Sequence, residues 1–167
     1  MPPTPAFPRW IQTDADHNLR EVGQGLYVGA ELSPGLRPAG PWSAVVDLYG
    51  TSELTSHGFL YQGSRKVLTW PFDDGDHFPS GCLDNIEKIT REQRAIGPVL
   101  LHCQAGLSRS CSAAYAMMRL MGFPDDEALR RVKVYPEFPR APTLASAHRW
   151  TQKRLQEPRT SRLPRMT

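Results

Sequence analysis

Short apolar runs separated by turn-forming residues occupy much of the first two thirds of the chain. Four of them are rich in β-branched residues and are bounded by Gly, Pro or Ser, which predicts strands at 25–30, 43–49, 66–72 and 98–103. Several of these runs are apolar at successive positions, a pattern typical of strands that are covered on both faces. The pattern therefore predicts a mostly parallel sheet in the interior of the molecule.

Apolar residues at helical spacing lie between and after the predicted strands. They predict a helix over 81–95, a second that starts near Ser110 and ends at Gly122, a short third from Asp125 to Val132, and a last one that runs through Leu155. Ser80, Asp125 and Thr143 are the expected N-caps of the first, third and last helices. Strands that alternate with helices indicate an α/β fold, with a central sheet of four to five strands and helices on both faces.

The length of 167 residues and a hydrophobic content of 40% suit one domain with one core. We expect a proline-rich arm at 1–18, the folded domain at 19–156 and a flexible basic tail at 157–167. The net charge of +3 is small. It gives no reason to expect nucleic acid as a partner, no apolar run predicts insertion into a membrane, and we expect a monomer.

The chain has three cysteines, which is an odd number and too few for a disulfide scaffold. We therefore expect a reducing compartment, the cytoplasm, with the nucleus as the alternative. We interpret Cys82 and Cys111 as small buried hydrophobic residues.

The segment VLLHCQAGLSRSCS, residues 99–112, joins a predicted strand to a predicted helix and carries the remaining cysteine, Cys103, as well as Cys111. The connection after Cys103 is made of small residues that let the backbone approach a ligand closely. Backbone N–H groups at the start of a helix, together with the helix dipole, form an anion site, and Arg109 adds a planar donor for phosphate oxygens. The same charges would stabilise a thiolate at Cys103. The segment therefore predicts a phosphate-binding loop that carries its own nucleophile.

The motif His-Cys-x-Ala-Gly-x-Ser-Arg-Ser at 102–110 resembles the signature of cysteine-dependent protein tyrosine phosphatases, specifically the dual-specificity branch. AYAM at 114–117 and GLYVGA at 25–30 resemble other elements of that branch. The resemblance implies a nucleophile, Cys103, and a substrate-binding Arg109, with His102 ordering the loop and Ser110 steadying the departing thiolate. It also implies that the substrate phosphate binds to the loop residues Gln104, Ala105, Gly106, Leu107 and Ser108.

Expelling an alkoxide or phenoxide from phosphate requires a proton, so we expect an acid on a separate loop. WPFDDGDHFP at 70–79 is rich in turn residues and offers Asp73, Asp74 and Asp76. In the resembling family the acid follows a Pro-hydrophobic-x-Asp pattern upstream of the cysteine, which here selects Asp74. Asp73 and Asp76 stay as alternatives.

The expected activity is hydrolysis of phosphotyrosine, and of phosphoserine or phosphothreonine as well, through a phosphocysteine intermediate, with no metal and no cofactor. The expected partner is a phosphorylated protein or peptide. Three alternatives stay open: a phosphatase for phosphoinositides or other non-protein phosphomonoesters, a module that binds phosphopeptides without turnover, and a sulfur-transfer enzyme of the rhodanese type. The loop carries no lysine, which makes the phosphoinositide less favoured.

Overall fold

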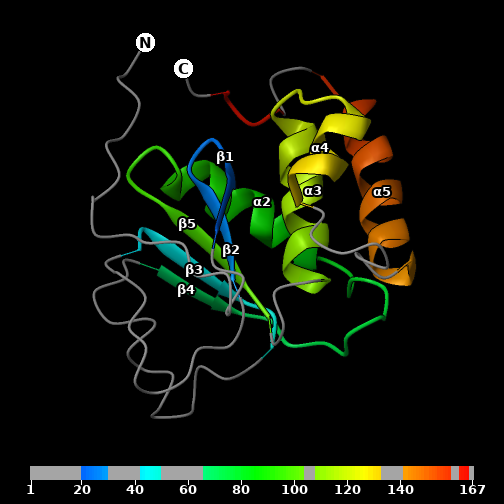
Figure 1. Cartoon of the computed structure of the whole chain (residues 1–167), viewed down its shortest axis with the longest axis horizontal. Coiled ribbons are helices and arrows are strands. Elements are labelled where there is room, and N and C mark those ends of the chain that lie inside the picture. The colour runs from blue at the N-terminus through cyan, green and yellow to red at the C-terminus, as the bar shows by residue number, and fades with distance from the viewer. Residues whose placement is uncertain are drawn as a thin grey trace.

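The computed structural model describes residues 20–29, 42–49, 66–103, 108–132, 141–158 and 162–165. Five strands form one sheet (Figure 1). They are β1 (Arg20–Gly23), β2 (Leu26–Gly29), β3 (Ala44–Asp47), β4 (Lys66–Thr69) and β5 (Val99–His102). Their order across the sheet is β1-β2-β5-β3-β4.

Four of the five strands run parallel, which confirms the predicted α/β class. β5 lies between β2 and β3 and is parallel to both, β4 pairs with β3, and β1 pairs antiparallel with β2. The four parallel strands therefore end at one edge of the sheet. In sheets of this kind the groups that follow the carboxyl ends of the strands form the binding site.

Four helices are described: α2 (Cys82–Gln93), α3 (Arg109–Leu120), α4 (Asp125–Val132) and α5 (Ala141–Leu155). α3 lies against β2 and β5, and α4 and α5 pack on α3 (Figure 1). The main core joins these helices to alternate side chains of the strands, among them Val28, Val46 and Leu101. The described helices thus cover one face. The intervening side chains Val45 and Leu100 are buried too, as expected of strands covered on both faces.

Four local predictions differ from the structure. α4 begins at Asp125, so this residue is the first of the helix rather than its N-cap. β1 was not predicted, because a four-residue edge strand that begins Arg-Glu carries too little apolar pattern. The N-cap of α2 is Gly81 rather than Ser80, and Gly81 has a φ of +83°, a conformation that glycine adopts at no steric cost. α5 begins at Ala141, so Thr143 lies inside the helix instead of capping it, and its hydroxyl bonds elsewhere.

Residues 162–165 pack on the domain, although the sequence predicts a flexible tail over 157–167. Leu163 is 2% exposed and belongs to the main core. Guanidinium groups of α2 hold the backbone on either side of it, since Arg91 donates to the carbonyl of Arg162 over 2.8 Å and Arg94 donates to the carbonyl of Pro164. Arg165 lies over the ring of Phe123. Within the described residues, no helix is both long and apolar enough to span a bilayer.

Leu163→Ala should lower the free energy of unfolding by about 2 kcal/mol, because it removes a buried side chain from the core. Chemical denaturation measures this change. Ile96→Ala is the matched control, since Ile96 is 50% exposed and its truncation should cost little. Equal effects of the two substitutions would mean that the tail does not pack on the domain in solution.

Candidate active site

The carboxyl edge of the parallel strands brings together the ends of β3, β4 and β5 and the start of α3. The hydrogen-bond ladder reaches the last residues of the strands: the amide of Cys103 donates to the carbonyl of Gly29 over 3.3 Å, and the amide of Leu48 donates to the carbonyl of His102 over 2.8 Å. Cys103 therefore has a backbone fixed on both sides by neighbouring strands.

The predicted nucleophile lies at the base of the first turn of α3. Cys103 is 2% exposed, and its Sγ is 3.2 Å from the Oγ of Ser110, which is fully buried. A hydroxyl at this distance can donate a hydrogen bond to a thiolate, which is a weak acceptor but gains strength from its charge. The structure thus pairs the two side chains that the motif places seven positions apart.

His102 is held between a carboxylate and a carbonyl in the interior. Its Nδ1 is 3.0 Å from the carbonyl oxygen of Cys103, and its Nε2 is 3.6 Å from Oδ1 of Asp47. Both side chains are fully buried. Asp47 also accepts the amide of Tyr49 over 2.9 Å. The imidazole therefore connects the end of β3 to the backbone of Cys103. Asp47 was not among the residues predicted from the sequence, in which it is visible only as a charged residue at the end of an apolar strand.

Arg109 connects the start of α3 to the loop that follows β4. Its Nη1 donates to the carbonyls of Phe72, over 2.6 Å, and of Leu48, over 3.2 Å, and its guanidinium lies over the ring of Tyr49 at 5.6 Å. The buried Nε of Arg109 and the buried Oγ of Ser108 have no hydrogen-bond partner in the part of the chain that the structure describes. Buried polar groups without partners are uncommon, and at the start of a helix they suit an anion.

Of the three candidate acids, Asp74 is the one whose carboxylate has a described contact with the cysteine loop. Its Oδ1 is 3.9 Å from Nε of Arg109, and the side chain keeps 35% exposure. Asp73 and Asp76 are exposed, as Asp74 is, and their backbone groups bond to each other across the turn over 3.1 Å. The geometry favours Asp74 as the residue that can reach both solvent and a group bound at Arg109.

Four predicted binding residues, Gln104, Ala105, Gly106 and Leu107, lie outside the described residues, so their part stays a prediction. Cys82 and Cys111 are fully buried, as the sequence analysis expected. Burial raises the pKa of both thiols to about 12, and Arg20, which donates to Cys111 over 3.1 Å, only partly offsets this effect on the second.

Iodoacetamide should leave Cys82 and Cys111 unmodified between pH 7 and pH 9 while the protein is folded. With a pKa of about 12, only on the order of one thiol in ten thousand is ionised at pH 8, and burial also blocks the reagent. Peptide mass spectrometry measures the extent of labelling. Urea-unfolded protein is the control, in which both thiols should react. Rapid labelling of either thiol in the folded protein would contradict this geometry.

No family model matches the sequence, and no curated protein matches it. Among solved structures, Tk-PTP in its active form is similar with a TM-score of 0.64 and 21% identity, covering 82% of this chain and 97% of that one. Human DUSP28 is similar with a TM-score of 0.64 and 24% identity, covering 84% of this chain and 96% of that one. P. aeruginosa TpbA in complex with phosphotyrosine is similar with a TM-score of 0.57 and 19% identity, covering 84% of this chain and 86% of that one. This chain therefore has the fold of the protein tyrosine and dual-specificity phosphatases, with Cys103 and Arg109 placed where β5 passes into α3.

Proposed function

We propose that this protein is a protein phosphatase that hydrolyses phosphotyrosine, and phosphoserine or phosphothreonine as well, through a phosphocysteine intermediate. The observation that carries the proposal is the convergence of Cys103, Ser110, Arg109 and Asp74 at one edge of the sheet. The fold shared with phosphatases, one of them in complex with phosphotyrosine, supports a phosphorylated protein or peptide as substrate.

In the first step the thiolate of Cys103 attacks phosphorus, so that the S–P bond forms and the bond from phosphorus to the leaving oxygen breaks. Asp74 gives its proton to that oxygen, which leaves as a neutral alcohol or phenol. Arg109 and the amides at the start of α3 bind the three equatorial oxygens and stabilise their charge in the transition state. The donors that Arg109 uses to bind the phosphate include Nε, which has no hydrogen-bond partner among the described residues.

In the second step Asp74, now a carboxylate, takes a proton from water as the water oxygen attacks phosphorus. The S–P bond breaks, inorganic phosphate is released, and the sulfur departs as a thiolate. The hydroxyl of Ser110, 3.2 Å from that sulfur, donates a hydrogen bond to it as its charge develops. The site thus returns to its starting state without a redox change or an added cofactor.

Cys103→Ser should lower the turnover of para-nitrophenyl phosphate by about a thousandfold or more, because a serine hydroxyl is not ionised at neutral pH. Binding of a phosphotyrosine peptide, followed by calorimetry, should persist. Cys82→Ala is the matched control, because it removes a buried thiol outside the site and should keep activity. Turnover that survives Cys103→Ser would refute the mechanism, and a parent protein that binds the peptide without hydrolysing it would be a binding module.

Asp74→Asn should lower kcat/KM for phenyl phosphate by about a hundredfold and kcat/KM for para-nitrophenyl phosphate much less, because kcat/KM reports the first step, in which a good leaving group needs little protonation. Steady-state kinetics with both esters measures the difference. Asp73→Asn and Asp76→Asn are the controls, and each should behave like the parent. If one of these controls shows the leaving-group dependence instead, that residue is the acid.

A further inference from the structure

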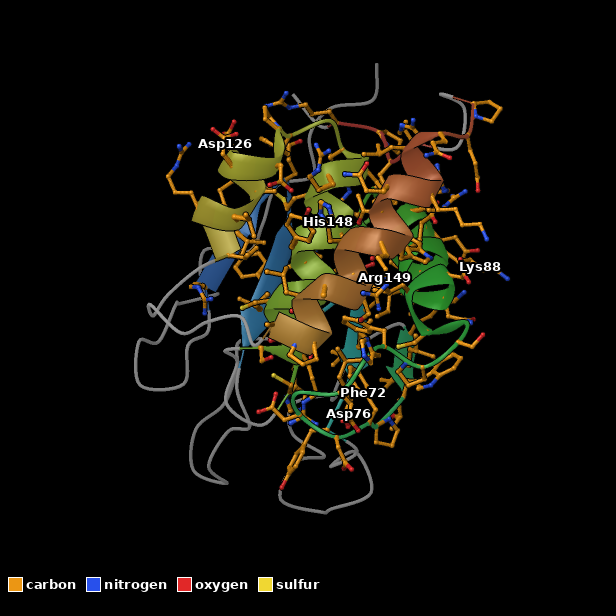
Figure 2. The ribbon with its side chains drawn as sticks, turned by 90° about the vertical axis from the view of Figure 1, so that its right-hand side faces the viewer. Phe72, Asp76, Lys88, Asp126, His148 and Arg149 are labelled. Atoms are coloured by element: carbon orange, nitrogen blue, oxygen red, sulfur yellow. The ribbon has the colours of Figure 1, made fainter. Side chains whose placement is uncertain are left out.

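Three consecutive residues of the 70–79 loop are held by side chains of α5. The Oγ1 of Thr143 donates to the carbonyl of Asp76 over 2.7 Å, and the amide of Phe78 donates to the Oγ of Ser146 over 2.9 Å. Between them, Nη2 of Arg149 lies 3.0 Å from Nδ1 of His77. Figure 2 shows Phe72 and Asp76 on the loop beneath α5 and Arg149 on the side of that helix.

Thr143 is the third residue of α5, so the carbonyl one turn before it lies outside the helix, and its hydroxyl donates to the loop. A buried threonine in a helix ordinarily donates to the carbonyl one turn before it, and Thr151 of the same helix does this, to Ala147 over 2.8 Å. Both threonines are fully buried. The donor of Thr143 therefore depends on the loop for its hydrogen bond, and a loop that moved away would leave this hydroxyl unsatisfied at a cost in free energy.

A second hydrogen bond, made to the backbone of α5, fixes the orientation of the Ser146 hydroxyl. Its Oγ donates to the carbonyl of Thr143 over 2.9 Å, which directs the lone pairs of that oxygen toward the amide of Phe78. One hydroxyl thus fixes the loop and is itself fixed by the backbone of α5. The two serine and threonine contacts act as a single anchor, called here the α5 anchor (Thr143 and Ser146).

The first part of the same loop has a separate anchor on the sheet and on α3. The amide of Trp70 donates to the carbonyl of Asp47 over 2.9 Å, and Arg109 donates to the carbonyl of Phe72 over 2.6 Å. The rings of Phe72 and Phe78 lie 5.0 Å apart and join the two halves of the loop. Asp74 lies in the turn between the anchored halves.

We propose that Thr143 and Ser146 are positioning residues that hold Asp74 where it can protonate the leaving oxygen. This inference rests on the proposed function, in which Asp74 is the acid. Because a displacement of about 1 Å at a catalytic group can cost a hundredfold in rate, a loop fixed at one half only would keep the acid but deliver its proton poorly. The anchor acts through Asp74 and makes no contact with the substrate.

The test is the double variant Thr143→Val with Ser146→Ala, which removes both hydroxyls and keeps nearly the same side-chain volumes. We expect kcat/KM for phenyl phosphate to fall about tenfold and kcat/KM for para-nitrophenyl phosphate to change less than about twofold, because kcat/KM reports the step in which the leaving oxygen is protonated. Thr151→Val is the matched control: it removes an equally buried hydroxyl of the same helix and should match the parent. Equal losses with both esters, or the same loss in the control, would overturn the proposal.

A second comparison isolates the route through the acid. In the Asp74→Asn background the double variant should cause no further loss, because the group that the anchor positions no longer carries a proton. A further tenfold loss in that background would contradict the proposal. If Cys103→Ser abolishes turnover while the double variant keeps the leaving-group dependence of the parent, the proposed function stands and the anchor does not.

Hydrogen exchange provides a readout that does not depend on activity. The amide of Phe78 should exchange faster in Ser146→Ala than in the parent, while the amide of Trp70, bonded to β3, should be unaffected. Unchanged exchange at Phe78 would show that the hydroxyl of Ser146 does not hold the loop, whatever reaction the protein catalyses. Thermal melting confirms that each variant is folded before either measurement.

Discussion

The structure depends on the parallel pairing of β5 with β2 on one side and β3 on the other. This pairing continues past the last strand residues, with Cys103 bonded to Gly29 and Leu48 bonded to His102. A nucleophile must stay within a few tenths of an ångström of its attack geometry, and a backbone fixed on two sides provides that. The sulfur of Cys103 also lies 3.2 Å from the Oγ of Ser110, so it is in direct contact with the first turn of α3.

In the proposed mechanism, Arg109 links substrate binding to the placement of the acid. One of its nitrogens bonds the carbonyls of Leu48 and Phe72, and its buried Nε lies 3.9 Å from Asp74. A guanidinium has five donors in one plane, so it can hold backbone groups and still offer donors to a phosphate. Lysine could not replace it here, because a single ammonium cannot meet both sets of acceptors in this geometry.

Contacts with α2 and α3 hold α5 in place beside the loop at 70–79. It packs on α3, its Trp150 donates to Asp84 of α2 over 3.1 Å, and Arg154 pairs with Glu87 of α2. These contacts leave the helix little freedom, so hydroxyls on its first turns are fixed reference points for the loop. A helix that begins more than thirty residues after Cys103 thus contacts the loop that carries Asp74.

The sequence by itself determined the fold class, and it supplied the hypothesis that Cys103 is the nucleophile, with Arg109 beside it and the acid on the loop at 70–79. Strands and helices are recognised from the local periodicity of apolar residues. Cys103 and Arg109 belong to one short motif, so neither the elements nor the motif requires knowledge of a distant contact. Tertiary structure decided the rest. Asp47 beside His102, Thr143 as an anchor in place of a cap, and the buried Leu163 all depend on partners more than fifty residues away or on burial that no local pattern records. A hydroxyl or carboxylate has the same local signal whether it caps a helix, faces solvent or holds a loop, and only the folded chain supplies the partner that distinguishes these cases.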